Sequence, residues 1–192
     1  MPLPGPEPLV LASASPQRRA ILEQLGVPFE VRPADVLETA HGDPETVARD
    51  NALLKATVVA ARSAGRTVLG VDTLVTLDEE IFGKPPTPEA AAAMLLRLQG
   101  REHTVFSGIA VCDATGGVPR ALVQGTRVRF APLSTAAVSA YIATGEWRGR
   151  AGSYAIQGRG AALVDEIRGD YFNVVGLPVP ALRRLLPGLL GV

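Results

Sequence analysis

A short apolar run that carries one acid is the strongest constraint on how this chain can fold. Residues 68–77 read VLGVDTLVTL, and the charged side chain among them is Asp72. Runs of this length, rich in Val and Leu, are typical of buried strands. An ionised carboxylate inside such a strand is costly unless it is paired, bound to a metal or placed at a wet strand end. We therefore expect Asp72 to lie at a strand end, as a candidate functional group.

A second charged group follows Asp72 at a distance that suits a hairpin. After the turn-like residues 78–80 comes Gly-Lys-Pro at 83–85. If the two halves pair, Lys84 returns close to the end of the strand that carries Asp72. The spacing fits an ordinary hairpin with a turn lysine equally well, so spacing alone leaves both interpretations open.

Composition separates the lysines from the other cations. Of the 19 basic residues, only Lys55 and Lys84 are lysine, and the rest are arginine. A compact ammonium group and a planar guanidinium group are not interchangeable at a phosphate. We infer that both lysines face a tightly specified anion, although a lysine on a helix, such as Lys55, is commonly just solvated.

A strand, a turn and a helix near the N-terminus predict an anion site. Residues 9–12 read as a short strand, and Ser15 and Pro16 supply a hydroxyl N-cap and a first helical position. The free N–H groups at such a helix start bind anions. Arg18 and Arg19 fall in the first turn, where cations oppose the helix dipole, so an anionic ligand would compensate them. A solvated arginine pair beside an ordinary cap also fits this pattern.

The remaining patterns alternate between strands and helices, with Glu38 in a polar loop and a Gly-rich loop at 145–160. Asp43 and Thr87 are predicted caps that are each followed by Pro, Ser134 or Thr135 is a predicted cap without Pro, and Gly marks several helix ends. The predicted strands are 29–36, 103–112, 121–130, 161–167 and 171–175, and the predicted helices are 44–64, 88–99, 135–144 and 178–186. Residues 1–8 are expected to form a loose tail, and residues 9–192 a single domain.

Charge and cysteine content exclude several classes of protein. The 19 acids balance the 19 bases, which disfavours a nucleic-acid or membrane-surface binder, because these carry a basic excess. One cysteine, Cys112, allows neither an internal disulfide nor a Cys-based zinc site. The first residues lack the features of a signal peptide, and no apolar run reaches membrane-spanning length. We expect a cytoplasmic protein.

A set of charged residues suits one kind of ligand. The cations Arg18, Lys55, Lys84 and Arg150 accompany the acids Asp72 and Glu38 and the anion-binding helix start. Carboxylates bind a hard cation through oxygen, and cations neutralise phosphoryl oxygens. A magnesium-bound triphosphate would use all of these groups.

Four segments then follow one another in the order of a known family. They are LASASPQRRAILEQLGVPFEV, the VDTLV and GKP core, LQGREHTVFSGIAV, and YIATGEWRGRAGSYAIQGRGAALVDEIRGDYFNVVGLP. Together they resemble the Maf family of nucleoside triphosphate pyrophosphatases, from Leu9 to about Leu186. The resemblance implies an α/β fold of the inosine triphosphatase-like Maf type, with a mixed central sheet flanked by helices and two lobes with a cleft between them.

The resemblance also implies a reaction and a site. The reaction is hydrolysis of a nucleoside triphosphate to the monophosphate and pyrophosphate, with Mg²⁺ or Mn²⁺. Asp72 matches the acid that accepts a proton from the attacking water, and Glu38 matches an acid near the metal and substrate. Thr73 points to dTTP and UTP as substrates. A homodimer is expected on resemblance alone. The residues that match phosphate or base contacts are Ser13, Arg18, Lys55, Lys84 and Gln157.

Two departures from the family pattern leave alternatives open. Gln17 stands where an arginine is common, and Gly149-Arg150 replaces Asp-Lys. Arg150 can still meet a phosphate, but the lost acid leaves the metal ligands unassigned beyond Asp72 and Glu38 as candidates. The alternatives are a non-catalytic nucleotide-binding regulator linked to cell division, and a pyrophosphatase for a modified nucleotide such as 7-methyl-GTP.

Overall fold

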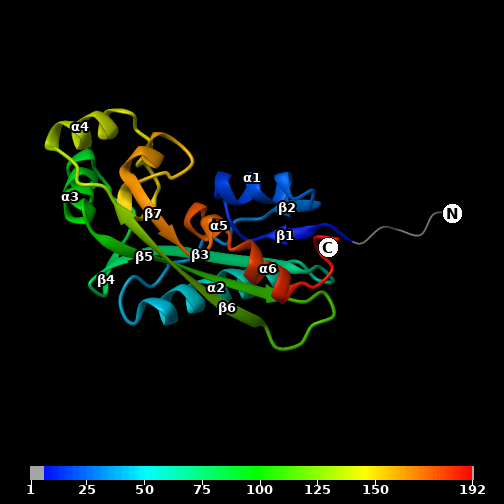
Figure 1. The fold of residues 1–192 in the computed structure, drawn as a ribbon. Helices are drawn as coiled ribbons and strands as arrows, with labels where there is room; N and C mark the ends of the chain where they lie inside the picture. The colour runs from blue at the N-terminus through cyan, green and yellow to red at the C-terminus, as the bar shows by residue number, and fades with distance from the viewer. Residues whose placement is uncertain (1–6, 192) are drawn as a thin grey trace.

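The computed structural model describes residues 7–191, and a seven-stranded sheet runs through them (Figure 1). The strand order is β2-β1-β3-β5-β6-β7, with β4 added beside β3. β1 is parallel to β2 and β3, and all other pairs are antiparallel. The expected mixed α/β architecture is confirmed. The strands are β1 Leu9–Leu11, β2 Phe29–Val31, β3 Val68–Leu77, β4 Glu80–Phe82, β5 Glu102–Cys112, β6 Arg120–Phe130 and β7 Val164–Arg168.

The helices divide the molecule into two lobes that share the long strands β3, β5 and β6 (Figure 1). One lobe packs α3 and α4 around an apolar cluster that includes Leu95, Phe130 and Tyr141. The other packs α1 and α6 against β1 around Leu11, Leu22 and Leu182. The helices are α1 Pro16–Gln24, α2 Pro44–Ala60, α3 Pro88–Leu98, α4 Thr135–Ala143, α5 Tyr171–Val175 and α6 Val179–Leu185. None of the helices in residues 7–191 combines the length and apolar character needed to cross a membrane.

Helix α2 lies against β3 and β5 at unusually close range, because two strand positions carry no side chain. A Cβ atom added at Gly70 would lie 2.2 Å from the carbonyl oxygen of Ala52, and one at Gly108 would lie 2.0 Å from that of Ala48. Both contacts are with helix backbone, which cannot rotate away. The two glycines therefore set the distance between α2 and the sheet.

The predicted capping residues begin their helices as expected. Ser15, Asp43, Thr87 and Ser134 each accept a hydrogen bond from a backbone N–H in the first turn of the helix that follows. A short polar side chain determines these starts locally, with a proline after it at Ser15, Asp43 and Thr87 but not at Ser134.

The predicted hairpin is also confirmed, because β4 pairs with β3 through Val75 and Phe82 and through Leu77 and Glu80. Asp78 and Glu79 form the two-residue turn with φ of 50° and 67°. Such a turn requires positive φ at both positions to match the twist of the strands.

Five sequence predictions were wrong or too long, and one of them is the helix predicted at 44–64, which ends at Ala60. Asp72 lies in the middle of β3 rather than at its end, because the apolar run continues as a strand on both sides. Residues 171–175 form the short helix α5, since Asp170 caps the N–H of Phe172 and Gly176, with φ of 128°, ends the turn. The strand predicted at 29–36 ends at Val31, before Pro33, and the one predicted at 161–167 begins at Val164, after a 3₁₀ turn. Most of the predicted N-terminal tail, residues 1–6, lies outside the described residues.

Candidate active site

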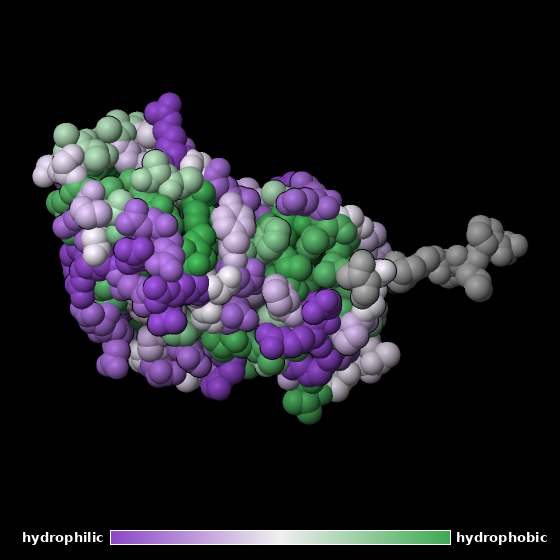
Figure 2. All heavy atoms as spheres, viewed as in Figure 1, coloured by the Kyte–Doolittle hydropathy of each residue, from purple (hydrophilic) through white to green (hydrophobic). Residues whose placement is uncertain are grey.

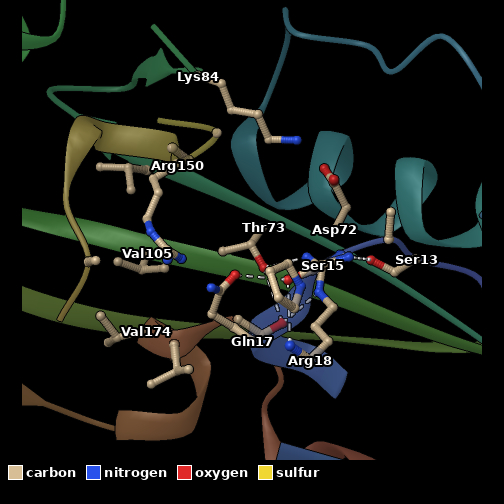
Figure 3. A pocket seen from close by; sticks show the side chains of 18 of the residues that line it. Ser13, Ser15, Gln17, Arg18, Asp72, Thr73, Lys84, Val105, Arg150 and Val174 are labelled. Atoms are coloured by element: carbon tan, nitrogen blue, oxygen red, sulfur yellow. Dashed lines mark hydrogen bonds between the residues drawn. The ribbon is translucent and has the colours of Figure 1, made fainter. Parts of the chain in front are cut away.

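A cavity of about 730 Å³ lies between the two lobes. On the surface, hydrophobic residues show on both lobes, with more hydrophilic residues between them (Figure 2). The walls of the cavity are formed by the start of α1 from one lobe, by the segment 149–158 from the other lobe, and by the middle of β3. Figure 3 shows Val105 and Val174 on one side of it and Asp72 and Ser13 on the other. All nine residues singled out from the sequence line this cavity: Ser13, Arg18, Glu38, Lys55, Asp72, Thr73, Lys84, Gln157 and Arg150.

The centre of the site is a buried ion pair between α2 and β3. Nζ of Lys55 donates to Oδ1 of Asp72 at 2.6 Å and forms an ion pair with Oε1 of Glu38 at 2.7 Å. Lys55 is therefore not a solvated helix lysine, because it lies between two carboxylates. The other oxygen of Asp72, Oδ2, accepts from Nδ2 of Asn51 at 3.0 Å.

The surroundings of Asp72 keep its carboxyl group ionised. Burial alone raises the pKa of this group, but the charge and hydrogen bond of Lys55, the hydrogen bond of Asn51 and the charge of Arg18 outweigh burial. The pKa of Asp72 consequently lies below its ordinary value. The buried acid that looked costly in the sequence is compensated by these three neighbours.

Arg18 joins three separate segments at the base of the cavity. Its Nε donates to the carbonyl oxygen of Gly176 at 2.9 Å, one terminal nitrogen donates to Oγ of Ser13 at 2.8 Å, and the other donates to Oγ1 of Thr73 at 3.0 Å. Burial lowers the pKa of Arg18, and the charges of Asp72 and Glu38 oppose that shift. Arg18 thus holds α1, β3 and the end of α5 together as well as contributing charge.

Thr73 uses its hydroxyl group within the protein. It accepts from Arg18 and shares a hydrogen bond of 2.8 Å with Oγ of the fully buried Ser107 on β5. The side chain that the sequence suggests as a specificity marker is therefore also a support for Arg18.

The remaining predicted residues lie nearer the mouth of the cavity. Lys84 follows β4, is exposed, and extends toward Asp72 in Figure 3. Arg150 lies on the same lobe as Lys84 and opposite Arg18, with its Nε donating to the carbonyl oxygen of Glu146 at 3.2 Å. Gln157 lies exposed in the Gly-rich loop. Cations from both lobes therefore face one cavity.

Sequence reasoning missed two residues that hold this arrangement in place. Asn51 binds Asp72 from α2, and Glu146 accepts the backbone N–H groups of Arg159 and Gly160, which closes the loop that carries Gln157. The position of Asn51 one helical turn before Lys55 was a usable signal, because residues i and i+4 share a helix face.

The carboxylates of the site fit a divalent cation only in part. Across residues 7–191, no group of three His, Cys, Asp or Glu side chains could hold a metal ion by itself. Mg²⁺ is commonly held by one or two carboxylates together with substrate phosphates. Glu38 and Asp72, on either side of Lys55, supply that smaller set.

The fold and the cavity define a mixed α/β protein with a cation-lined site between two lobes. The family model described as "Maf-like protein" matches residues 8–189. The chain belongs to this family.

Named relatives match the chain over nearly its whole length. It is 48% identical to a dTTP/UTP pyrophosphatase of Moorella thermoacetica and 47% identical to one of Gloeobacter violaceus, each over 180 residues. These matches cover 93% of this chain and 93% and 94% of the two relatives. A solved nucleoside-triphosphatase / dITP/XTP pyrophosphatase from Mycobacterium abscessus aligns with 66% of this chain and 74% of its own, at 18% identity and a TM-score of 0.44, too distant a likeness to bear on the site.

Proposed function

We propose that this chain hydrolyses dTTP and UTP to the nucleoside monophosphate and pyrophosphate. The names of its relatives support this substrate class. The observation that carries the proposal is the ionised, buried Asp72 inside a cavity that also receives Arg18, Lys55, Lys84 and Arg150. A triphosphate is the ligand whose charge such a group of cations would balance.

The cavity is large enough for a nucleotide and offers cations for its phosphates and apolar side chains for its base. Its volume of about 730 Å³ falls within the usual range of small-molecule sites, roughly 300–1,000 Å³. We place the triphosphate beside Lys55, Lys84 and Arg150, and the base toward the apolar side chains of Val105 and Val174. Gln157 would contact the base, and Thr73 would act on specificity by holding Arg18.

Asp72 is assigned the role of orienting and deprotonating the attacking water. The oxygen of that water bonds to the α-phosphorus, its proton passes to Asp72, and the bond from the α-phosphorus to the bridging oxygen breaks. The departing pyrophosphate keeps the electron pair, and Lys55, Lys84 and Arg150 stabilise its charge. Each oxygen of Asp72 already accepts one hydrogen bond, which leaves each a second acceptor position for the water.

A divalent cation, Mg²⁺ or Mn²⁺, fits this proposal. When bound, it would neutralise phosphate oxygens and polarise the α-phosphoryl group. Glu38 and Asp72 are the residues that would hold it, together with oxygens of the substrate. The glycine at position 149 supplies no further carboxylate.

Direct assay tests the proposal. The protein is incubated with dTTP, UTP, CTP, GTP or 7-methyl-GTP in the presence of Mg²⁺ or Mn²⁺, and pyrophosphate and phosphate are measured separately. We expect pyrophosphate from dTTP and UTP at rates well above those with the other nucleotides. Pyrophosphate from 7-methyl-GTP alone would overturn the substrate assignment. Nucleotide binding without any pyrophosphate would indicate a regulator, and release of single phosphates a stepwise phosphatase.

The proposal also covers the oligomeric state and the cellular location of the protein. We propose a cytoplasmic homodimer, on family resemblance. Light scattering of the purified protein measures the assembly, and a monomeric mass would contradict it.

A further inference from the structure

Asn51 is a buried polar residue that does not line the cavity. The residue is 3% exposed, and the residues that line the cavity do not include it. All its contacts in the site are therefore with protein groups. Through them it reaches both carboxylates of the site, one directly and one through the backbone.

The direct contact fixes how the Asp72 carboxylate is turned. Asn51 and Lys55 lie one turn apart on α2 and face the same side chain. Lys55 donates to Oδ1 of Asp72 at 2.6 Å, and Asn51 donates to Oδ2 at 3.0 Å. With a donor on each oxygen from one rigid helix, the carboxylate plane has a single favoured rotation.

The second contact holds the loop that carries Glu38. Oδ1 of Asn51 accepts the N–H of Thr39 at 2.9 Å, and Nδ2 donates to the carbonyl oxygen of Thr39 at 2.9 Å. Glu38 directly precedes Thr39, in a segment without helix or strand. Pinning both backbone groups of Thr39 therefore sets the starting point of the Glu38 side chain, which reaches Lys55 at 2.7 Å.

The chemistry of these contacts requires an asparagine. The position must offer two donors, to Asp72 and to the Thr39 carbonyl, and one acceptor, to the Thr39 N–H. An amide of this length meets that need, whereas a carboxylate offers no donor and an aliphatic side chain offers nothing. The same contacts determine the amide orientation, because the flipped amide would set its oxygen against two other acceptors.

We propose that Asn51 is a positioning residue for the hydrolysis, which orients the Asp72 carboxylate and holds the Glu38 segment beside Lys55. This inference rests on the proposed function, since the reaction is what the two carboxylates serve. Asn51 itself touches no substrate. Its loss should consequently lower kcat far more than it raises KM.

The kinetic test compares Asn51→Leu, Asn51→Asp and a control on the same helix. The control is Val47→Ala, a buried apolar truncation one turn from Asn51 that packs on Leu74 away from the site. We expect both Asn51 variants to lose about 10- to 100-fold in kcat for dTTP, as when a partner of a functional ligand is removed, with KM within about threefold of wild type. The control should keep the wild-type kcat per folded molecule. A kcat within twofold of wild type in both Asn51 variants, or an equal loss in the control, would overturn the inference.

Hydrogen exchange gives a readout that is independent of turnover. The amide of Thr39 should exchange faster in Asn51→Leu, which offers no acceptor, and stay protected in Asn51→Asp, which keeps one. Unchanged protection in Asn51→Leu would overturn the role in holding the loop. If Asn51→Leu fails to fold, the nearly isosteric Asn51→Asp still tests the effect on kcat.

The two proposals fail in different ways. A wild-type protein that releases no pyrophosphate overturns the proposed function and this inference with it. An active wild type whose Asn51 variants keep their kcat overturns the role of Asn51 alone.

Discussion

Among single residues, the ones that define this site are buried charges whose partners come from other elements. Asp72 on β3 is compensated by Lys55 and Asn51 on α2, and Arg18 on α1 by oxygens of Ser13, Thr73 and Gly176. Leaving one partner of a buried charge unpaired costs more than the net value of the pair. Substitutions at these positions should therefore change function and stability in ways that separate the roles of the residues.

Replacement of Asp72 by asparagine tests its proposed role as base. The side chain keeps its size but loses the negative charge and most of its basicity. We expect kcat for dTTP to fall by about 10²–10⁴-fold, the usual contribution of a general base, while KM changes by only a few-fold. Steady-state kinetics measure both values, and near-normal turnover would refute the assignment.

Replacement of Arg18 by lysine tests its role in joining three segments. A single ammonium group cannot reach Gly176, Ser13 and Thr73 in the directions that the planar guanidinium group serves. We expect the free energy of unfolding to fall by about 1–3 kcal/mol, the cost of leaving buried groups without partners. Urea denaturation measures this value.

The neighbouring Arg19→Lys is the matched control, because Arg19 is exposed on the same turn of α1. Its unfolding free energy should stay within about 0.5 kcal/mol of wild type. Equal stability of the Arg18 and Arg19 variants would show that the bonds of Arg18 contribute nothing measurable.

At the scale of elements, the close packing of α2 on the sheet decides the geometry of the site. This helix carries both Asn51 and Lys55, and it approaches β3 and β5 at Gly70 and Gly108. A helix held a few tenths of an ångström further away would lengthen every bond to Asp72. The two glycines thus affect the proposed reaction indirectly, because they set the distance between α2 and Asp72.

Gly108→Ala tests this link between packing and site. The new methyl group would lie 2.0 Å from the carbonyl oxygen of Ala48, so α2 has to move. We expect a loss of about 3 kcal/mol in unfolding free energy, at the upper end of the cost of overpacking a core, and a lower kcat in the folded protein. Gly83→Ala, where an added methyl group meets nothing within 4 Å, is the control for stability. A variant as stable as wild type would contradict the packing argument.

For the whole molecule, two lobes around separate apolar clusters create the cavity between them. Polar side chains are buried inside these lobes too, and His103 is the clearest case. It is 2% exposed in the α3–α4 lobe, and its Nε2 is 2.9 Å from the hydroxyl group of Tyr154. Burial lowers the pKa of His103 from 6.5 to about 4, so the folded protein keeps this imidazole neutral.

His103 should make the stability of the protein depend on pH. The unfolded chain takes up a proton near pH 6.5, whereas the folded protein takes it up only near pH 4. The contribution of neutral, buried His103 to the free energy of unfolding is therefore complete above pH 6.5. It falls as the pH decreases toward 4, by about 3 kcal/mol at most. In His103→Gln the decrease in unfolding free energy, measured by urea at pH 7, 5.5 and 4.5, should be smaller than in wild type, because only the contribution of the carboxylates is left. The exposed His41→Gln is the control, and an identical pH dependence in wild type and His103→Gln would contradict the prediction.

Helix starts and strands could be predicted from the sequence because neighbouring residues in the chain determine them. A capping side chain followed by Pro begins α1, α2 and α3, and alternation of apolar residues marks β5 and β6, whatever lies around them. The same rules failed for residues 171–175, where an aromatic and β-branched run suits a strand but the cap by Asp170 makes one helical turn. A segment of five residues is too short for periodicity to decide.

The helix starts, the hairpin, the charged residues of the site and the order of the elements except residues 171–175 could be predicted from the sequence. Which of these charges pair with one another is seen only in the folded protein. Lys55 is predicted to face an anionic ligand and Asp72 to lie at a strand end, yet the two form a buried pair with each other, with Asn51 beside them. Contacts across the fold depend on how closely two elements approach. That distance is set here by Gly70, two residues before Asp72 on β3, and by Gly108, which is paired with Asp72 across the sheet on β5.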